Sequence, residues 1–238
     1  MGSKQMVTDS GSREGDRVYS MLRKRILAVD LEPGSVLDEA RIVHDMGTSR
    51  TPVREAVIRL VSDGLLKRDG RQVIIPTFQV AQLRAFFETL LLYTRVTHRL
   101  AAERRNATQL ANIWQAVRSF EKEARNGIEF EMTDANHRLH RTIASSCDNI
   151  FFQEAYESIL LQSLRLSRHC FVAGIKSEYK HREHVETIME EHLAIAQAIE
   201  DGNAELTDIL ATDHITLFRS WLSEQLLGPA DLLNEMEL

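Results

Sequence analysis

The sequence predicts a mainly α-helical protein: an N-terminal winged helix-turn-helix of three helices and a small β-hairpin, followed by an all-α bundle of six to seven helices. Three observations predict this fold class. A short helix follows a glycine turn within residues 47–62. Two short apolar runs flank an Asp-Gly turn within residues 65–76. From Phe78 onward, apolar residues recur at helical spacing in consecutive segments without a convincing strand.

These patterns divide the 238-residue chain into four parts. We expect a disordered tail over residues 1–12 and a winged helix-turn-helix over residues 13–77. An all-helical domain is expected over residues 78–228, and a C-terminal tail over residues 229–238.

Composition favours a soluble, cytoplasmic protein. Hydrophobic residues make up 43% of the chain, enough for a core, and charged residues make up 27%. No apolar run approaches the length of a membrane span, and the N-terminus lacks the apolar region of a secretory signal. The two cysteines, Cys147 and Cys170, lack metal-motif spacing and are consistent with a reducing compartment.

The N-terminal elements follow from local signals. Val18, Met21, Leu22 and Ile26 predict a helix over residues 15–28. Residues 31–35, with Pro and Gly, form a turn, and a short helix over residues 38–46 ends at a glycine.

A second short helix covers residues 50–62. Ser49 is the candidate N-cap, and Pro52 lies in the first turn, where its missing N–H costs little. The side predicted to be buried consists of Val53, Val57, Leu60 and Val61.

The exposed start of this helix carries Arg50, Thr51 and Arg54, as a recognition helix entering a DNA major groove requires. The hairpin after it carries Lys67, Arg68 and Arg71 near its tip, where they can reach phosphates or the minor groove. Residues 13–76 have a net charge of +2, whereas the whole chain has −6. A local basic face beside an acidic bulk suits binding to double-stranded DNA, although +2 alone is weak support.

The C-terminal part reads as helices throughout. We expect them over residues 80–104, 107–126, 129–146, 151–172, 180–202 and 203–226.

Three histidines interrupt the apolar, inward-facing stripes of three of these helices: His140, His192 and His214. Asn136 precedes His140 by one helical turn. A lone core histidine is usually structural, but three facing one core favour a site for a divalent cation, most of all Zn, with Ni or Mn as alternatives. His98 has no partner at a convincing spacing, and His181 and His184 lie in a charged run expected to be solvated.

The chain resembles the GntR superfamily of bacterial transcription regulators, and its FadR subgroup in particular. The N-terminal resemblance rests on residues 31–34, 37, 47–56, 60 and 64–65. The C-terminal resemblance is to the FCD ligand-binding domain and rests on residues 100–102, 139–141, 149, 191–192, 198–203 and 214.

The resemblance implies a homodimeric regulator, expected to be a repressor, that binds palindromic operator DNA and responds to a small-molecule effector, expected to be a carboxylate. It assigns Ser49, Arg50, Thr51 and Arg54 to the DNA. An arginine reading guanine would contribute about 1–3 kcal/mol of discrimination. Many relatives carry an arginine where this chain has Ala40, and Arg41 is the candidate substitute.

The resemblance also implies metal ligands and an effector site. Metal-binding FCD domains supply Asp-x-x-x-His from one helix and one histidine from each of two later helices. Asn136, His140, His192 and His214 occupy these positions, with Asn in place of the more familiar Asp.

The effector site also departs from the family pattern. Leu90 and Thr94 stand where many relatives have an effector-binding Arg and a Glu. Arg165 and Arg168 are candidates to compensate for that arginine, and the alternative is that both are surface residues.

Two other functions remain open. One is a metal-dependent enzyme with a DNA-binding appendage, although no further motif supplies a nucleophile or a base. The other is a metal-free regulator in which the same histidines bind the ligand directly, or in which the bundle mainly dimerises through Phe86, Leu91 and Leu92.

Overall fold

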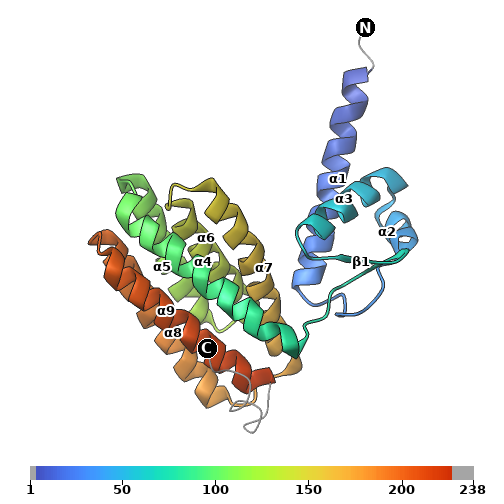
Figure 1. Cartoon of the computed structure of the whole chain (residues 1–238). Coiled ribbons are helices and arrows are strands. Elements are labelled where there is room, and N and C mark those ends of the chain that lie inside the picture. The colour runs from blue at the N-terminus through green and yellow to red at the C-terminus, as the bar shows by residue number, and fades with distance from the viewer. Residues whose placement is uncertain (1–3, 227–238) are drawn as a thin grey trace. The chain divides into compact units, whose positions relative to one another are not determined.

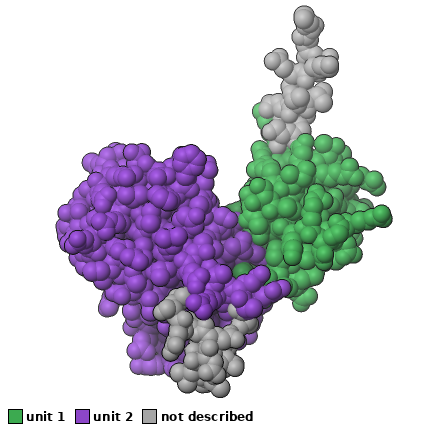
Figure 2. All heavy atoms as spheres, in the orientation of Figure 1, with its two compact units in different colours: residues 1–78 green, residues 79–238 purple. Residues whose placement is uncertain are grey.

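A computed structural model describes residues 4–226 of the chain (Figure 1). The chain forms two compact units, Met1–Phe78 and Gln79–Leu238, shown in different colours in Figure 2. The described residues are mainly helical, with a small two-stranded sheet in the first unit. The predicted fold class is therefore confirmed.

The first unit contains α1 (Lys4–Leu27), α2 (Glu39–Met46), α3 (Arg50–Ser62), β1 (Lys67–Asp69) and β2 (Gln72–Ile74). α1 packs against α3. Its core includes Val18 and Leu22 of α1, and Val53, Val57 and Leu60 of α3, all of them 1% exposed or less. The apolar spacing seen in the sequence therefore marks the buried side of both helices.

The hairpin turns at Gly70, whose φ of +58° is readily adopted only by glycine. β1 and β2 are antiparallel, with Arg68 opposite Val73. The segment before α2 extends this pairing, because the Leu37 amide donates to the Val73 carbonyl (2.8 Å) and the Ile75 amide to the Ser35 carbonyl (3.0 Å). The hairpin of β1 and β2, which is the wing of this fold, is thus hydrogen-bonded to the segment before α2.

The second unit begins with a short 3₁₀ turn, η1 (Val80–Gln82). The helices that follow are α4 (Leu83–Arg104), α5 (Ala107–Asn126), α6 (Glu129–Ser145), α7 (Ile150–Ala173), α8 (Glu178–Glu200) and α9 (Ala204–Leu226). α4 packs against α6, α7, α8 and α9, so it is the central helix of the bundle. None of the helices within residues 4–226 has a stretch long and apolar enough to cross a membrane.

The N-terminal tail prediction needs a correction. We expected disorder over residues 1–12, but α1 begins at Lys4. The segment contains no proline, so a helix established further along the chain can propagate into it. Residues 1–3, and the predicted tail over residues 229–238, lie outside the described residues.

Candidate DNA interface and buried histidine cluster

The helix-turn-helix is delimited by local caps. The Asp38 side chain accepts a hydrogen bond from the Arg41 amide (3.0 Å) and starts α2. Gly47 ends α2 in the left-handed conformation, at φ +60°. Ser49 occupies the N-cap position of α3 as predicted, but its side chain makes no capping hydrogen bond. The predicted N-cap position is therefore confirmed, and the Ser49 side chain is exposed and free of a capping bond.

α3 presents its predicted reading residues to solvent. Arg50, Thr51 and Arg54 are exposed on the N-terminal turns of the helix. The opposite side is buried in the unit's core, which fixes the rotation of the helix about its axis. A rigid helix with two arginines on its exposed start matches the geometry of a major-groove reader.

Further cations lie on the wing and on α2. Lys67 and Arg68 are exposed on β1, and Arg71 is exposed in the hairpin turn. Arg41 is exposed on α2 and lies 3.5 Å from Asp45 in an ion pair. An exposed pair of this kind is weak, so Arg41 can exchange Asp45 for a phosphate at little cost.

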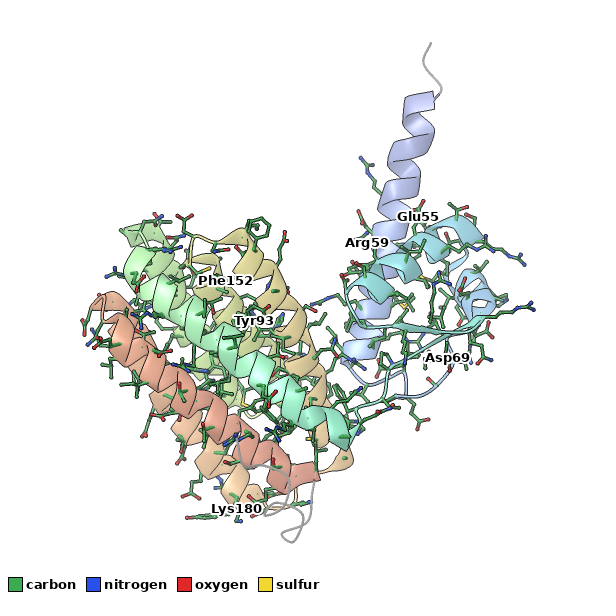
Figure 3. The ribbon with its side chains drawn as sticks, viewed as in Figure 1. Glu55, Arg59, Asp69, Tyr93, Phe152 and Lys180 are labelled. Carbon is green, nitrogen blue, oxygen red and sulfur yellow. The ribbon has the colours of Figure 1, made fainter. Side chains whose placement is uncertain are left out.

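A second set of contacts joins α3 to α1. Arg59, labelled on α3 in Figure 3, lies with its guanidinium 4.1 Å from the ring centroid of Tyr19. The Tyr19 hydroxyl donates to the Asp63 carboxylate (2.6 Å). Burial, followed by this hydrogen bond, raises the pKa of Tyr19. These contacts hold the C-terminal half of α3 in place while its start stays exposed.

The predicted histidines meet in the second unit. His140 on α6, His192 on α8 and His214 on α9 are at most 5% exposed. One ring nitrogen from each lies within 4.8 Å of the others. Nε2 of His140 and Nε2 of His214 lie 3.2 Å apart. Three separate helices thus bring three imidazoles to one point.

The donor atoms suit a cation. Neither ring nitrogen of His192 has a hydrogen-bond partner within the described part of the chain, and neither does the buried Oδ1 of Asn136. Burial holds the pKa values of His140 and His192 well below the usual range, so both imidazoles are neutral and offer lone pairs. Buried polar atoms are normally satisfied, and these are the atoms that a divalent ion would satisfy.

Two members of the cluster were missed from the sequence. Glu191 accepts a hydrogen bond from Nδ1 of His214 (2.7 Å), a contact between two helices that its place next to His192 in the sequence does not reveal. His98 is fully buried on α4, and its Nε2 lies 3.3 Å from Nδ1 of His140. A signal for His98 was available: it lies one turn after Thr94, on the same inward stripe.

The predicted effector residues separate into two groups. Leu90 and Thr94 are buried on α4, and Leu90 lines a cavity beside the histidines. Thr94 Oγ1 lies 2.9 Å from the Tyr156 hydroxyl. The alternative that Arg165 and Arg168 are surface residues is wrong, because both are at most 5% exposed.

Neither arginine lies among the cavity-lining residues. Arg168 pairs with Asp134 (2.7 Å) and donates to the Phe130 carbonyl (2.9 Å). Arg165 donates to the side-chain oxygen of Gln162 (2.7 Å). Arg168 therefore binds residues of α6, whereas Arg165 binds a residue of its own helix, α7.

His181 and His184 also differ from expectation. They were expected to be solvated, but His184 is 9% exposed, His181 is half-buried, and both line the same cavity. The charged run around them misled the prediction, because only one side of the first turns of α8 faces solvent. His184 lies two turns before His192, on the inward side of the same helix.

The fold and these two sites define a winged-helix DNA-binding protein with a helical sensor domain. The comparisons with known proteins agree: residues 14–74 match the family described as bacterial regulatory proteins, gntR family, and residues 85–217 match the FCD domain. The chain belongs to the GntR family of DNA-binding transcription regulators and carries an FCD effector-binding domain.

Curated relatives are regulators rather than enzymes. The chain is 24% identical over 189 residues to an uncharacterized HTH-type transcriptional regulator, YdhC, of Bacillus subtilis, covering 79% of this chain and 81% of the relative. It is 25% identical over 237 residues to the gluconate operon transcriptional repressor of Bacillus licheniformis, covering 92% and 91%. The enzyme alternative is therefore set aside.

Solved structures share the fold. E. coli McbR/YncC matches with a TM-score of 0.75 at 20% identity, covering 89% of this chain and 98% of that chain.

Proposed function

We propose that the protein is a metabolite-responsive repressor that binds palindromic operator DNA as a homodimer. The observation that carries this proposal is the exposed start of α3, where Arg50, Thr51 and Arg54 lie above a fully buried side. Each protomer would place one α3 in the major groove of a half-site, and its wing would contact the flanking phosphates. A repressor role is supported by the name of the Bacillus licheniformis relative.

We further propose that the histidine cluster holds a divalent cation, most of all Zn, with Ni or Mn as alternatives. His140, His192 and His214 would be its ligands, and Asn136 Oδ1 a fourth. When bound, the cation would supply a positive charge and open coordination positions for an effector oxygen. Glu191 orients the His214 ring, a common role for a carboxylate behind a metal-binding histidine.

Binding of the effector in the helical domain would change the affinity of the protein for operator DNA. Such coupling is typically about 1–3 kcal/mol, or roughly a 5–150-fold change in affinity. We expect the effector to bind in the cavity lined by Leu90, Asn136, His140 and His214.

The DNA proposal is tested by gel shift on operator DNA. Arg50→Ala and Arg54→Ala should each lose about 1–3 kcal/mol of specific binding while the protein stays folded. Arg118→Ala is the matched control, because it removes the same charge from an exposed position on α5. Operator binding that is undiminished in both α3 variants would refute the assignment.

The metal proposal is tested by elemental analysis of protein purified without an affinity tag. Near-stoichiometric metal should be present and should be lost in the His140→Ala/His192→Ala double variant. A metal-free wild type that still responds to its effector would instead support direct hydrogen bonding of the ligand by the histidines.

A further inference from the structure

The cavity beside the histidine cluster is lined by apolar, aromatic and uncharged polar side chains together with histidines. It has a volume of about 70 Å³ and is partly open to solvent. Among the described residues, its lining contains no Lys, Arg, Asp or Glu. Beyond the end that carries the histidines, the described residues therefore offer no charged side chain to a bound ligand.

The nearby arginines do not supply the missing charge. Arg165 and Arg168 are buried outside the lining, with contacts to Gln162 and Asp134 respectively. Leu90 fills the position on α4 that faces the cavity. A second anionic group on the ligand would lose its water without gaining a partner, and this disfavours its binding.

The end formed by α7, α8 and α9 is aromatic instead. The Trp221 ring stacks on His184, with ring centroids 5.0 Å apart and an interplanar angle of 2°. Phe171 and Phe218 lie 5.5 Å and 6.3 Å from the same ring. Burial lowers the pKa of His184 to about 3, so this imidazole is uncharged at neutral pH.

One polar atom at this end lacks a partner. Trp221 is 7% exposed, and its Nε1 is buried without a hydrogen-bond acceptor among the described residues. A buried indole N–H normally finds an acceptor. Since Trp221 lines the cavity, a ligand atom is a natural candidate for that acceptor.

We propose that the ligand class for this cavity is a planar aromatic monocarboxylate with a hydrogen-bond acceptor at its far end. The carboxylate would lie at the end lined by Asn136, His140 and His214. The ring would lie among the aromatic side chains, and the acceptor would receive the Trp221 N–H. This inference rests on the proposed effector site and narrows the class of acid that it admits.

The chain offers a direct optical test, because Trp114 and Trp221 are its two tryptophans. Trp114 lies on α5, donates to the Glu200 carboxylate (3.0 Å) and does not line the cavity. Trp114→Phe therefore leaves Trp221 as the reporter. This protein, loaded with zinc, is titrated with 4-hydroxybenzoate, benzoate, terephthalate and gluconate. Fluorescence locates the ligand and calorimetry gives the dissociation constants.

We expect 4-hydroxybenzoate to bind most tightly and to change Trp221 fluorescence. Benzoate lacks the acceptor and should bind about tenfold more weakly. Terephthalate adds a second charge and gluconate lacks a ring, so both should be weaker still. On the otherwise wild-type chain, Trp221→Phe should abolish the preference for 4-hydroxybenzoate over benzoate, whereas Trp114→Phe should preserve it. Leu90→Arg should add a cation to the cavity and improve terephthalate binding relative to benzoate.

Two results would overturn this inference. One is binding of gluconate or terephthalate at least as tight as that of 4-hydroxybenzoate, and the other is failure of every probe to bind. Zinc content and operator binding, measured on the same preparation, report separately on the proposed function.

Discussion

Glu191→Gln isolates the support that the protein gives to its proposed metal ligands. In the structure the Glu191 carboxylate accepts from Nδ1 of His214 at 2.7 Å, and the two side chains are 19% and 6% exposed. Glutamine retains an acceptor oxygen but removes the negative charge. Removing a hydrogen-bond partner behind a metal ligand lowers metal affinity by about 10–100-fold, and we expect a value near the lower end because the acceptor remains.

The expected magnitude follows from this affinity change. At zinc concentrations well above both dissociation constants, a tenfold weaker affinity removes about 1.4 kcal/mol of zinc-induced stabilisation. For a folding unit of 150–250 residues this corresponds to about 3–6 °C in Tm. The measurement is thermal unfolding with and without zinc, for the wild type and the variant.

Glu190→Gln provides the matched control, because it makes the same charge change at the adjacent, exposed position of α8. Glu190→Gln should keep the full zinc-induced rise in Tm. If Glu191→Gln also keeps it, the carboxylate does not support a metal ligand and the reasoning fails.

Three further predictions concern the wing and the two cores. Arg68→Ala should weaken binding to all DNA sequences alike and reduce the slope of log affinity against log salt by about 1 for each phosphate that the arginine neutralises. Tyr19 has a raised pKa when folded, caused first by burial and then by its hydrogen bond to Asp63, so its stabilising contribution is complete below pH ~10 and disappears as pH rises through the folded pKa. Tyr19→Phe should therefore show a shallower decrease of unfolding free energy in alkali. Tyr156→Phe should lower the free energy of unfolding by about 1 kcal/mol, because Thr94 Oγ1 keeps its bond to the Leu90 carbonyl.

Each of these predictions has a contrary outcome. An unchanged salt slope for Arg68→Ala would place the wing away from phosphate. Parallel alkaline profiles for wild type and Tyr19→Phe would show that the hydroxyl of Tyr19 contributes no pH dependence. If the free energy of unfolding of Tyr156→Phe fell by several kcal/mol, the Tyr156 hydroxyl would have to make further stabilising contacts besides the one to Thr94.

Periodicity and caps were sufficient to predict most of the fold. The glycine in the left-handed conformation and the buried stripe of α3 are properties of a few adjacent residues, so residues 50–62 were predicted with the observed ends. The three histidines were found because each interrupts an apolar stripe, and a stripe determines the side of the helix that faces the core.

The contacts between helices were harder to predict, since they depend on how one helix is placed against the next. Glu191 points away from its neighbour in sequence and meets His214 from another helix. Arg168 is buried because α7 places it against the first turns of α6, where Asp134 and Phe130 receive it. For Arg168, charge alone suggested the surface, and burial with a partner reversed that expectation.

The row of rings formed by His98, His140 and His214 also determines where protons reside. The Glu191 carboxylate accepts from Nδ1 of His214, so a neutral His214 carries no proton on Nε2. At the other end of the row, the Thr97 hydroxyl donates to the Tyr93 carbonyl, so Nδ1 of His98 donates to that hydroxyl and Nε2 of His98 accepts from Nδ1 of His140. Nε2 of His140 is then also unprotonated, and two lone pairs face each other 3.2 Å apart. A cation held between them would satisfy both without moving a proton, so the imidazole nitrogen chemical shifts of His98 should keep the same tautomer signature when the site is filled.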